Sequence, residues 1–159
     1  MGVILWTDRV FRIRRVHAPA PSPPRIPQRA LVAGGAGPLP TALAERLAAA
    51  LDVPLVPAGE LAGPAEVARL AAFEGWVSTA ERPADRAVLL PRAELVVVVL
   101  GEEPGTLRGL VRRTVRRMRA DGPEPDLGWV DLLPGTHPDA AVVRLVGGEA
   151  VDAWLGRLG

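Results

Sequence analysis

The 159-residue chain is 48% hydrophobic and 23% charged, the balance of one folded domain rather than of a disordered chain. Its formal net charge of +1 indicates neither a nucleic-acid nor a membrane partner, although charge can still be unevenly placed. The sequence has no Cys and no Lys, which excludes disulfides, thiolate nucleophiles, zinc–thiolate sites, Schiff bases and a phosphate-binding ammonium.

The rest of the composition narrows the chemistry further. All nineteen basic residues are Arg, and Ala, Gly, Pro and Leu are abundant, as in a coding sequence of high G+C content. The two histidines, His17 and His137, lie in Pro-flanked loops, so we expect no metal site and no Ser-His-Asp triad. The apolar stretch Val3–Trp6 is too short for a signal peptide, and no segment is long enough to span a membrane. We therefore expect a cytoplasmic protein without a membrane partner.

The first 28 residues differ from the rest of the chain. Residues 1–16 mix apolar residues and arginines in a β-like pattern. Five prolines between Ala18 and Gln28 then predict a stiff, extended linker (Pro19, Pro21, Pro23, Pro24, Pro27). We therefore divide the chain into an N-terminal extension with a Pro-rich linker, residues 1–28, and one domain, residues 29–159.

From Arg29 onward, short apolar runs alternate with helical patterns, which is typical of a parallel sheet with crossover helices. This predicts an α/β fold with three layers, α-β-α, around a five-stranded parallel sheet. The unbroken apolar run Leu95–Leu100 predicts a central strand. The expected strands are Ala30–Gly34, Val53–Pro57, Gly75–Thr79, Leu95–Leu100 and Ala141–Val146, and the expected helices are Thr41–Leu51, Ala65–Phe73, Thr106–Ala120 and Glu149–Leu158.

The first strand runs through Gly34-Gly35-Ala36-Gly37-Pro38-Leu39-Pro40-Thr41 into a helix, which is where a phosphate-binding loop belongs. Such a loop has the form G-x-x-x-x-G-K-[ST]; its amides surround the phosphates, its Lys reaches the outer ones and its hydroxyl holds Mg²⁺. Gly34 and Thr41 match the two ends of this form. Leu39 and Pro40 replace the second glycine and the lysine. The same loop also fits a plain Gly- and Pro-rich turn with no nucleotide history.

Several segments, taken in their order and spacing, resemble the adenylate-kinase-like proteins known as DNA topology modulation proteins, small P-loop kinases. The likeness covers residues 29–157. It rests on the loop and helix Gly34–Leu51, on Trp76-Val77 followed by Arg92-Ala93-Glu94 and the apolar strand, on Leu110-Val111-Arg112-Arg113-Thr114, and on Val143-Arg144-Leu145 before Val151-Asp152-Ala153-Trp154-Leu155. The resemblance implies a sheet of the P-loop kinase type.

The polar positions of that family are nearly all replaced in this chain. Where the family has an Asp after its second strand, this sequence has Gly59 before Glu60. Where it has Asp-Gly-Asn-Tyr after the Trp-Val pair, this sequence has Thr79-Ala80-Glu81-Arg82, and Leu100-Gly101-Glu102 replaces its Asp-Leu-Pro. The resemblance therefore implies a retained fold with a lost active site, and we assign no catalytic residue.

The segment Thr106–Ala120 has six arginines and no acid, with like charges four residues apart that destabilise an isolated helix and call for a compensating anion. In the resembled kinases this region is a lid over nucleotide phosphates, which would assign anion contacts to Arg112, Arg113 and Arg116. A solvated helix face, or one paired with nearby acids, explains the arginines equally well.

The leading hypothesis is a degenerate P-loop kinase-like domain, a pseudoenzyme with a binding or regulatory role and at most weak nucleotide or anion binding. Its degenerate phosphate loop would comprise Gly34, Gly35, Gly37 and Thr41. It needs no cofactor, and its partner is a phosphate-bearing anion or a protein. The first alternative is an active ATP-dependent nucleotide or small-molecule kinase that uses ATP and Mg²⁺, with Glu60 or Glu81 replacing the lost carboxylates. The second is a nucleic-acid-associated module that binds through the Arg-rich helix.

Overall fold

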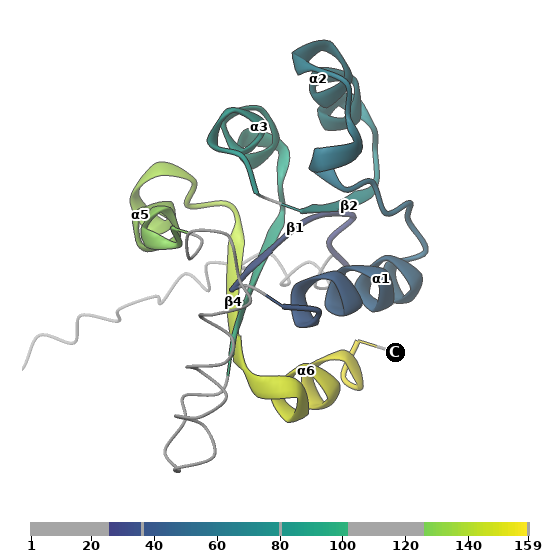
Figure 1. Ribbon diagram of the computed structural model, residues 1–159, viewed down its shortest axis with the longest axis vertical. Coiled ribbons are helices and arrows are strands. Elements are labelled where there is room, and N and C mark those ends of the chain that lie inside the picture. Colours follow the sequence, from purple (N-terminus) through teal and green to yellow (C-terminus); the bar gives the residue numbers. More distant parts are fainter. Residues whose placement is uncertain (1–25, 36, 80, 102–125, 159) are drawn as a thin grey trace, which may run out of the picture.

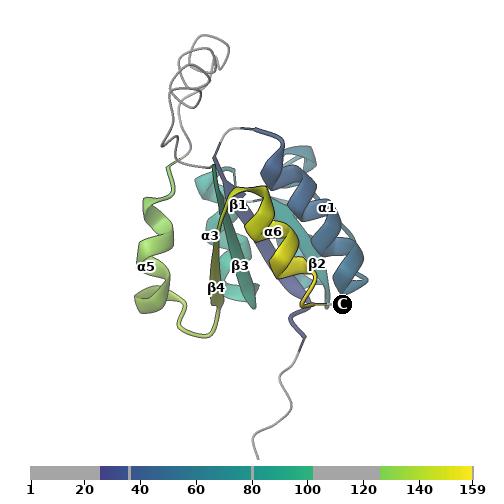
Figure 2. The same ribbon diagram turned by 90° about the horizontal axis from the view of Figure 1, so that it is seen from below.

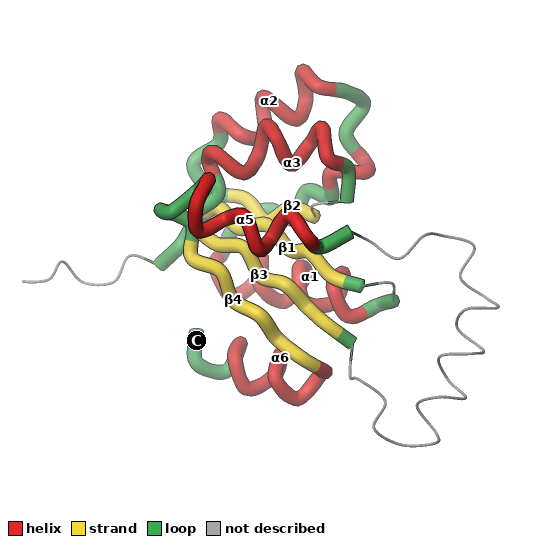
Figure 3. The backbone as a smooth tube through the Cα atoms, turned by 90° about the vertical axis from the view of Figure 1, so that its left-hand side faces the viewer, coloured by secondary structure: helices red, strands yellow, loops and turns green. Residues whose placement is uncertain are grey.

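The computed structural model describes residues 26–35, 37–79, 81–101 and 126–158. Four strands in this part of the chain form one sheet in the order β2-β1-β3-β4, and every neighbouring pair is parallel (Figure 3). The strands are β1 (Arg29–Gly34), β2 (Trp76–Thr79), β3 (Leu95–Leu100) and β4 (Ala141–Val146). The predicted α/β class and parallel sheet are confirmed.

Helices cover both faces of the sheet (Figures 1 and 2). One face packs against α1 (Leu39–Leu51) and α6 (Gly147–Leu155), whose apolar residues share one core cluster with the sheet. The other face packs against α2 (Pro64–Ala72), α3 (Pro83–Leu89) and α5 (Gly128–Thr136). Two short 3₁₀ helices, η1 (Ala58–Glu60) and η2 (Leu90–Arg92), complete the described elements. The described residues thus form three layers, as predicted.

β3 is internal and links the two halves of the core. Because side chains alternate along a strand, Leu95, Val97 and Val99 point into the cluster with α1 and α6. Val96 and Val98 point into the cluster with α2, α3 and α5. All five residues are at most 4% exposed, which explains why this strand reads as an unbroken apolar run.

The predicted fifth strand is wrong, since the sheet has four strands. The segment Val53–Pro57 does lie beside β2, but it makes only the isolated parallel bridge Leu55↔Val77. The Val56 N–H donates to the Val77 carbonyl at 2.8 Å, and the Val77 N–H donates to the Pro54 carbonyl at 2.9 Å. Pro54 has no N–H to continue the ladder, and η1 begins directly after Pro57, so the pairing stops there.

Two described helices, α3 and α5, were not predicted, and α1 begins two residues before the predicted Thr41. α3 has seven residues, and α5 contains Pro134 in its interior, so neither shows a long helical period. The β-like segment 1–16, the linker up to residue 25 and the Arg-rich segment Thr106–Ala120 lie outside the described residues.

Candidate functional site

The carboxyl ends of β1 and β3 form the position where open parallel sheets usually bind ligands. Such a site lies where the chain leaves two neighbouring strands toward opposite sides. From β1 the chain continues through α1 toward β2, and from β3 it continues through α5 to β4. α1 and α5 lie on opposite faces of the sheet (Figure 1). The turn that follows Gly34 is therefore the candidate site.

Gly34 leaves no room for a side chain at this position. An added Cβ would lie 2.5 Å from Cγ of Pro40 and 2.8 Å from the carbonyl oxygen of Val99. The Gly35 N–H donates to the same Val99 carbonyl at 3.3 Å. The turn is thus closed against β3, and the ring of Pro40 fills the space beside Gly34.

The start of α1 has few free hydrogen-bond donors. Gly37 has a φ of 136°, which favours glycine, and Pro38 follows as the residue that caps the helix. The Pro38 carbonyl accepts the Ala42 N–H at 3.0 Å. Because Pro38 and Pro40 have no N–H, Leu39 and Thr41 carry the remaining amide donors between the cap and Ala42.

The structure thus brings Gly34, Gly35, Gly37 and Thr41 together in one strand-to-helix turn, as the sequence predicts. Thr41 is exposed in the first turn of α1, where its hydroxyl faces no described partner. Arg112, Arg113 and Arg116 lie outside the described residues, so their predicted contacts with an anion stay a prediction.

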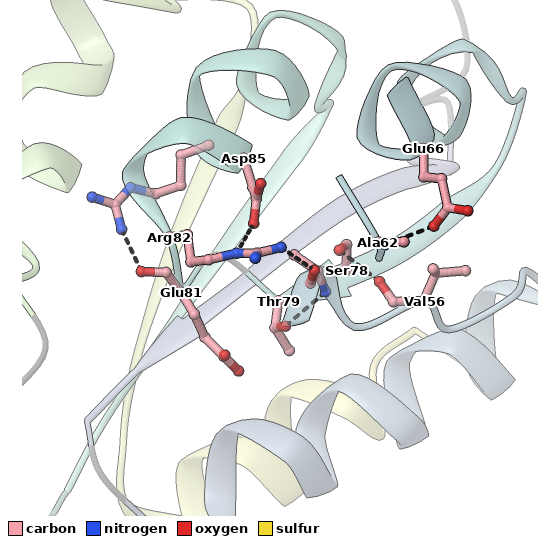
Figure 4. A network of polar contacts seen from close by, with 10 residues as sticks. Val56, Ala62, Glu66, Ser78, Thr79, Glu81, Arg82 and Asp85 are labelled. Atoms are coloured by element: carbon pink, nitrogen blue, oxygen red, sulfur yellow. Dashed lines mark hydrogen bonds and ion pairs between the residues drawn. The ribbon is translucent and has the colours of Figure 1, made fainter. Parts of the chain in front are cut away.

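A polar network lies beside this turn, at the end of β2, and the sequence did not reveal it (Figure 4). Ser78, which is fully buried, donates its hydroxyl to the Val56 carbonyl at 2.7 Å. Thr79, also buried, accepts the Ala58 N–H at 3.3 Å through its hydroxyl. Both side chains therefore hold the segment that leads into η1 against β2.

Arg82 extends the network to α3. Its Nε donates to the carboxylate of Asp85 at 2.6 Å, and its Nη2 donates to the Ala58 carbonyl at 2.8 Å. Asp85 is only 7% exposed. An acid three residues after an arginine, with Pro83 between them, was the one sequence signal for a helix start here.

The two glutamates considered as replacement carboxylates lie near this network. Glu60 is the last residue of η1, and Glu81 follows β2; both are exposed. A Cβ added at Gly59 would lie 3.5 Å from the Glu81 carboxylate, so the two segments approach one another closely. In Figure 4 the Glu81 carboxylate points away from Arg82. The carboxylate has no ion-pair partner among the described residues.

A shallow groove of about 230 Å³ lies between α5 and the ends of β3 and β4. Its apolar wall includes Leu100 and Leu127, and its polar wall is formed by Asp131 and Arg144. These two side chains form an ion pair with each other, from Nη2 to Oδ1 at 2.5 Å. The groove therefore presents a neutralised pair rather than a free charge.

The carboxylate of Glu94, at the amino edge of the sheet, has a lowered pKa. Partial burial acts to raise the pKa of Glu94, but its hydrogen bonds outweigh that effect. The Gln28 N–H donates to it at 2.7 Å and the Arg29 guanidinium at 2.6 Å, and they hold the pKa of Glu94 below its ordinary value. Glu94 therefore joins β1 to β3 at the edge opposite the candidate site.

Comparison with protein family models, with curated proteins and with solved structures gives no match. Across the described residues, no helix has the length and apolar character needed to cross a membrane. In the same residues, no three His, Cys, Asp or Glu side chains gather closely enough to hold a metal ion.

Proposed function

We propose that this chain is a degenerate P-loop kinase-like domain that does not transfer phosphoryl groups and that has a binding or regulatory role. The observation that carries the proposal is the β1–α1 turn. It lies where a phosphate-binding loop lies, yet the Pro40 ring packs on Gly34, and the Gly35 N–H donates to Val99. The Pro40 ring therefore occupies the space beside Gly34, and the Gly35 N–H is already hydrogen-bonded within the protein.

The energetic cost to phosphate binding is large. A hydrogen bond to a charged group contributes about 1.5 to 3 kcal/mol, and removal of one preorganised donor lowers a rate by about 10²- to 10³-fold. Pro38 and Pro40 each delete a donor, Gly35 directs a third donor to the protein, and Pro40 replaces the lysine. Losses of this size at several positions support a domain without useful phosphoryl transfer.

The sequence supports the same conclusion from a second direction. The chain contains no lysine, so an ammonium cannot reach the phosphates from elsewhere in the fold. Arginine is the one strong cation that this protein offers to an anion. Weak anion binding, if retained, is therefore assigned to Arg112, Arg113 and Arg116, the arginines given by the resemblance.

Calorimetric titration of the full chain with ATP, with and without Mg²⁺, tests the proposal, together with a phosphoryl-transfer assay on nucleosides. We expect no turnover and no Mg²⁺-dependent binding. Weak, Mg²⁺-independent binding that is lost in Arg112→Ala or Arg116→Ala would fit a residual anion site. Micromolar, Mg²⁺-dependent binding with turnover would instead support the atypical kinase, and steeply salt-dependent DNA binding would support the nucleic-acid module.

A gain-of-function variant tests the P-loop origin separately. Leu39→Gly with Pro40→Lys restores the second glycine and the lysine, and it also removes the ring that packs on Gly34. We expect this pair to create measurable ATP binding, whereas the matched pair Leu39→Ala with Pro40→Ala should not. A folded Gly-Lys variant without ATP binding would favour a plain strand-to-helix turn with no nucleotide history.

A further inference from the structure

β4 has one side that no described strand covers. The Ala141 N–H donates to the Glu94 carbonyl at 2.9 Å, so the backbone groups of Ala141, Val143 and Leu145 point toward β3. The alternate residues Val142 and Arg144 point their N–H and C=O groups outward, where the described residues provide no backbone partner. Such a row of unpaired groups is a template for a further strand.

The opposite edge of the sheet is already covered. The Val56 N–H donates to the Val77 carbonyl, and the Val77 N–H donates to the Pro54 carbonyl, so the segment Val53–Pro57 lies against β2. Pro54 also blocks a longer ladder on that side. Within the described part of the sheet, β4 is the edge open to a strand of six residues.

We infer that residues 10–16 of the same chain pair with β4 as an antiparallel strand. This segment reads Val-Phe-Arg-Ile-Arg-Arg-Val, with Phe11 and Ile13 on one face of a strand and Arg12 and Arg14 on the other. Its seven residues match the six of β4 in length. An antiparallel strand at the edge of a parallel sheet is a common arrangement.

Gln28 lies close enough to β4 for the linker before it to place residues 10–16 along this strand. The Gln28 N–H donates to the Glu94 carboxylate, and the Glu94 carbonyl accepts from Ala141 at the start of β4. From β1 to a strand beyond β4 is three strand spacings, about 15 Å. The Pro-rich residues 17–25 span about 28 Å when extended, so the linker is long enough. An antiparallel strand also ends at the amino edge of the sheet, where Gln28 lies, whereas a parallel one would end at the far edge.

Charge favours the extension over a second copy of the chain. The first 28 residues contain five arginines and one acid, whereas residues 126–158 contain five acids and two arginines. Asp139 and Glu149 flank the two ends of β4, are exposed and form no ion pair with described residues. Pairing of β4 with its own copy would bring two segments of net negative charge together, whereas residues 10–16 belong to a segment of net positive charge. This inference is independent of whether the protein binds a nucleotide.

Amide hydrogen exchange on the full chain, followed by NMR, tests the inference. We expect the outward amides of Val142 and Arg144 to exchange as slowly as that of Val143. The pair Phe11→Pro with Ile13→Pro removes two N–H groups from the docked segment and should speed exchange at both outward amides by at least about tenfold. The matched pair Val3→Pro with Leu5→Pro places the same prolines outside the docked segment and should leave both rates unchanged.

Light scattering on the same samples should give the mass of one chain. Fast exchange at Val142 and Arg144 in the full chain would overturn the inference, and so would protection that survives Phe11→Pro with Ile13→Pro. Protection accompanied by twice the mass would show that a second copy covers β4, which also overturns it. Unchanged exchange in β1 and β3 verifies that each variant is folded.

Discussion

Two strand-to-helix turns lie next to each other at the carboxyl edge of the sheet, one after β1 and one after β2. Both place a proline at the start of the following helix, Pro40 in α1 and Pro83 in α3. In the first turn, the ring of Pro40 fills the space beside Gly34. The second turn gathers polar groups, and Ser78, Thr79 and Arg82 bond to neighbouring backbone or side-chain atoms.

The difference shows two ways in which the edge of a parallel sheet that usually binds ligands becomes part of the folded framework instead. At the β1–α1 turn, donors are deleted by Pro38 and Pro40. At the β2–α3 turn, donors are present, but they hold η1 and α3 in place. Packing should therefore dominate the energetics of the first turn, and hydrogen bonding should dominate those of the second.

Between the two turns, the larger effect is expected at Gly34. Gly34→Ala places a Cβ 2.5 Å from Cγ of Pro40 and 2.8 Å from the Val99 carbonyl oxygen, and backbone cannot move as easily as a side-chain end. We expect the free energy of unfolding to fall by about 1 to 3 kcal/mol, the usual cost of overpacking. Urea denaturation would measure the change.

Gly35→Ala is the matched control, because an added Cβ there meets nothing within 4 Å. It should alter the free energy of unfolding by less than about 0.5 kcal/mol. Equal losses at both glycines would contradict the view that Pro40 and β3 close the turn against Gly34.

A smaller loss is expected at the second turn. Ser78→Ala deletes a hydroxyl that donates to the Val56 carbonyl inside the fold. The carbonyl loses its donor, which should lower the free energy of unfolding by about 1 to 2 kcal/mol. Thr136→Ala serves as the control, since its hydroxyl donates to the Leu132 carbonyl at an exposed site where water can replace it. Comparable losses for both variants would argue against a buried role for Ser78.

Acid should weaken the opposite edge of the sheet by a still smaller amount. The pKa of Glu94 is lowered in the folded protein, so its contribution is present above the unfolded pKa and is lost as the pH falls through the folded pKa. Because the Glu94 side chain is 40% exposed, solvent screening limits this contribution to under about 1 kcal/mol.

Urea titrations of wild type and Glu94→Gln across acidic pH measure this contribution. The stability difference between the two proteins should be present at neutral pH and vanish below the lowered pKa. Glu74→Gln changes an exposed glutamate with no described partner and serves as the matched control. If wild type and Glu94→Gln still differed in stability in strong acid, the shape of the Glu94 side chain rather than its charge would account for the difference.

Much of the fold could be predicted because β1, β2 and β3 are buried on both faces. The run Leu95–Leu100 and the other apolar segments identify all four strands within about one residue at each end. The fifth strand failed at Pro54, whose missing N–H is a local property that apolar spacing does not reveal. α3 and α5 were missed because short helices gain their stability from packing rather than from a long period.

The candidate site could be predicted only in part. The glycine spacing placed Gly34, Gly35, Gly37 and Thr41 in one turn, since neighbours in sequence remain neighbours there. The contact of Pro40 with Gly34 is also local. The bonds of Ser78 and Arg82 join residues 22 and 24 positions apart, and they reach backbone carbonyls that any residue could supply. Residue identity alone cannot reveal such backbone partners.

The smallest effect is expected where α1 and α6 meet at the surface. Arg46 and Asp152 form an ion pair at 2.5 Å, but their side chains are 51% and 66% exposed. Arg46→Ala should change the free energy of unfolding by no more than about 0.5 kcal/mol, since water screens the pair and Ala favours helix. Leu47, the next residue along α1, is fully buried in the cluster that α1 shares with α6, so Leu47→Ala should cost about 2 to 5 kcal/mol. Urea denaturation at low and high salt measures both variants. A large loss of unfolding free energy in Arg46→Ala would mean that the ion pair holds α1 and α6 together. The buried Leu47 indicates that apolar packing holds them together instead.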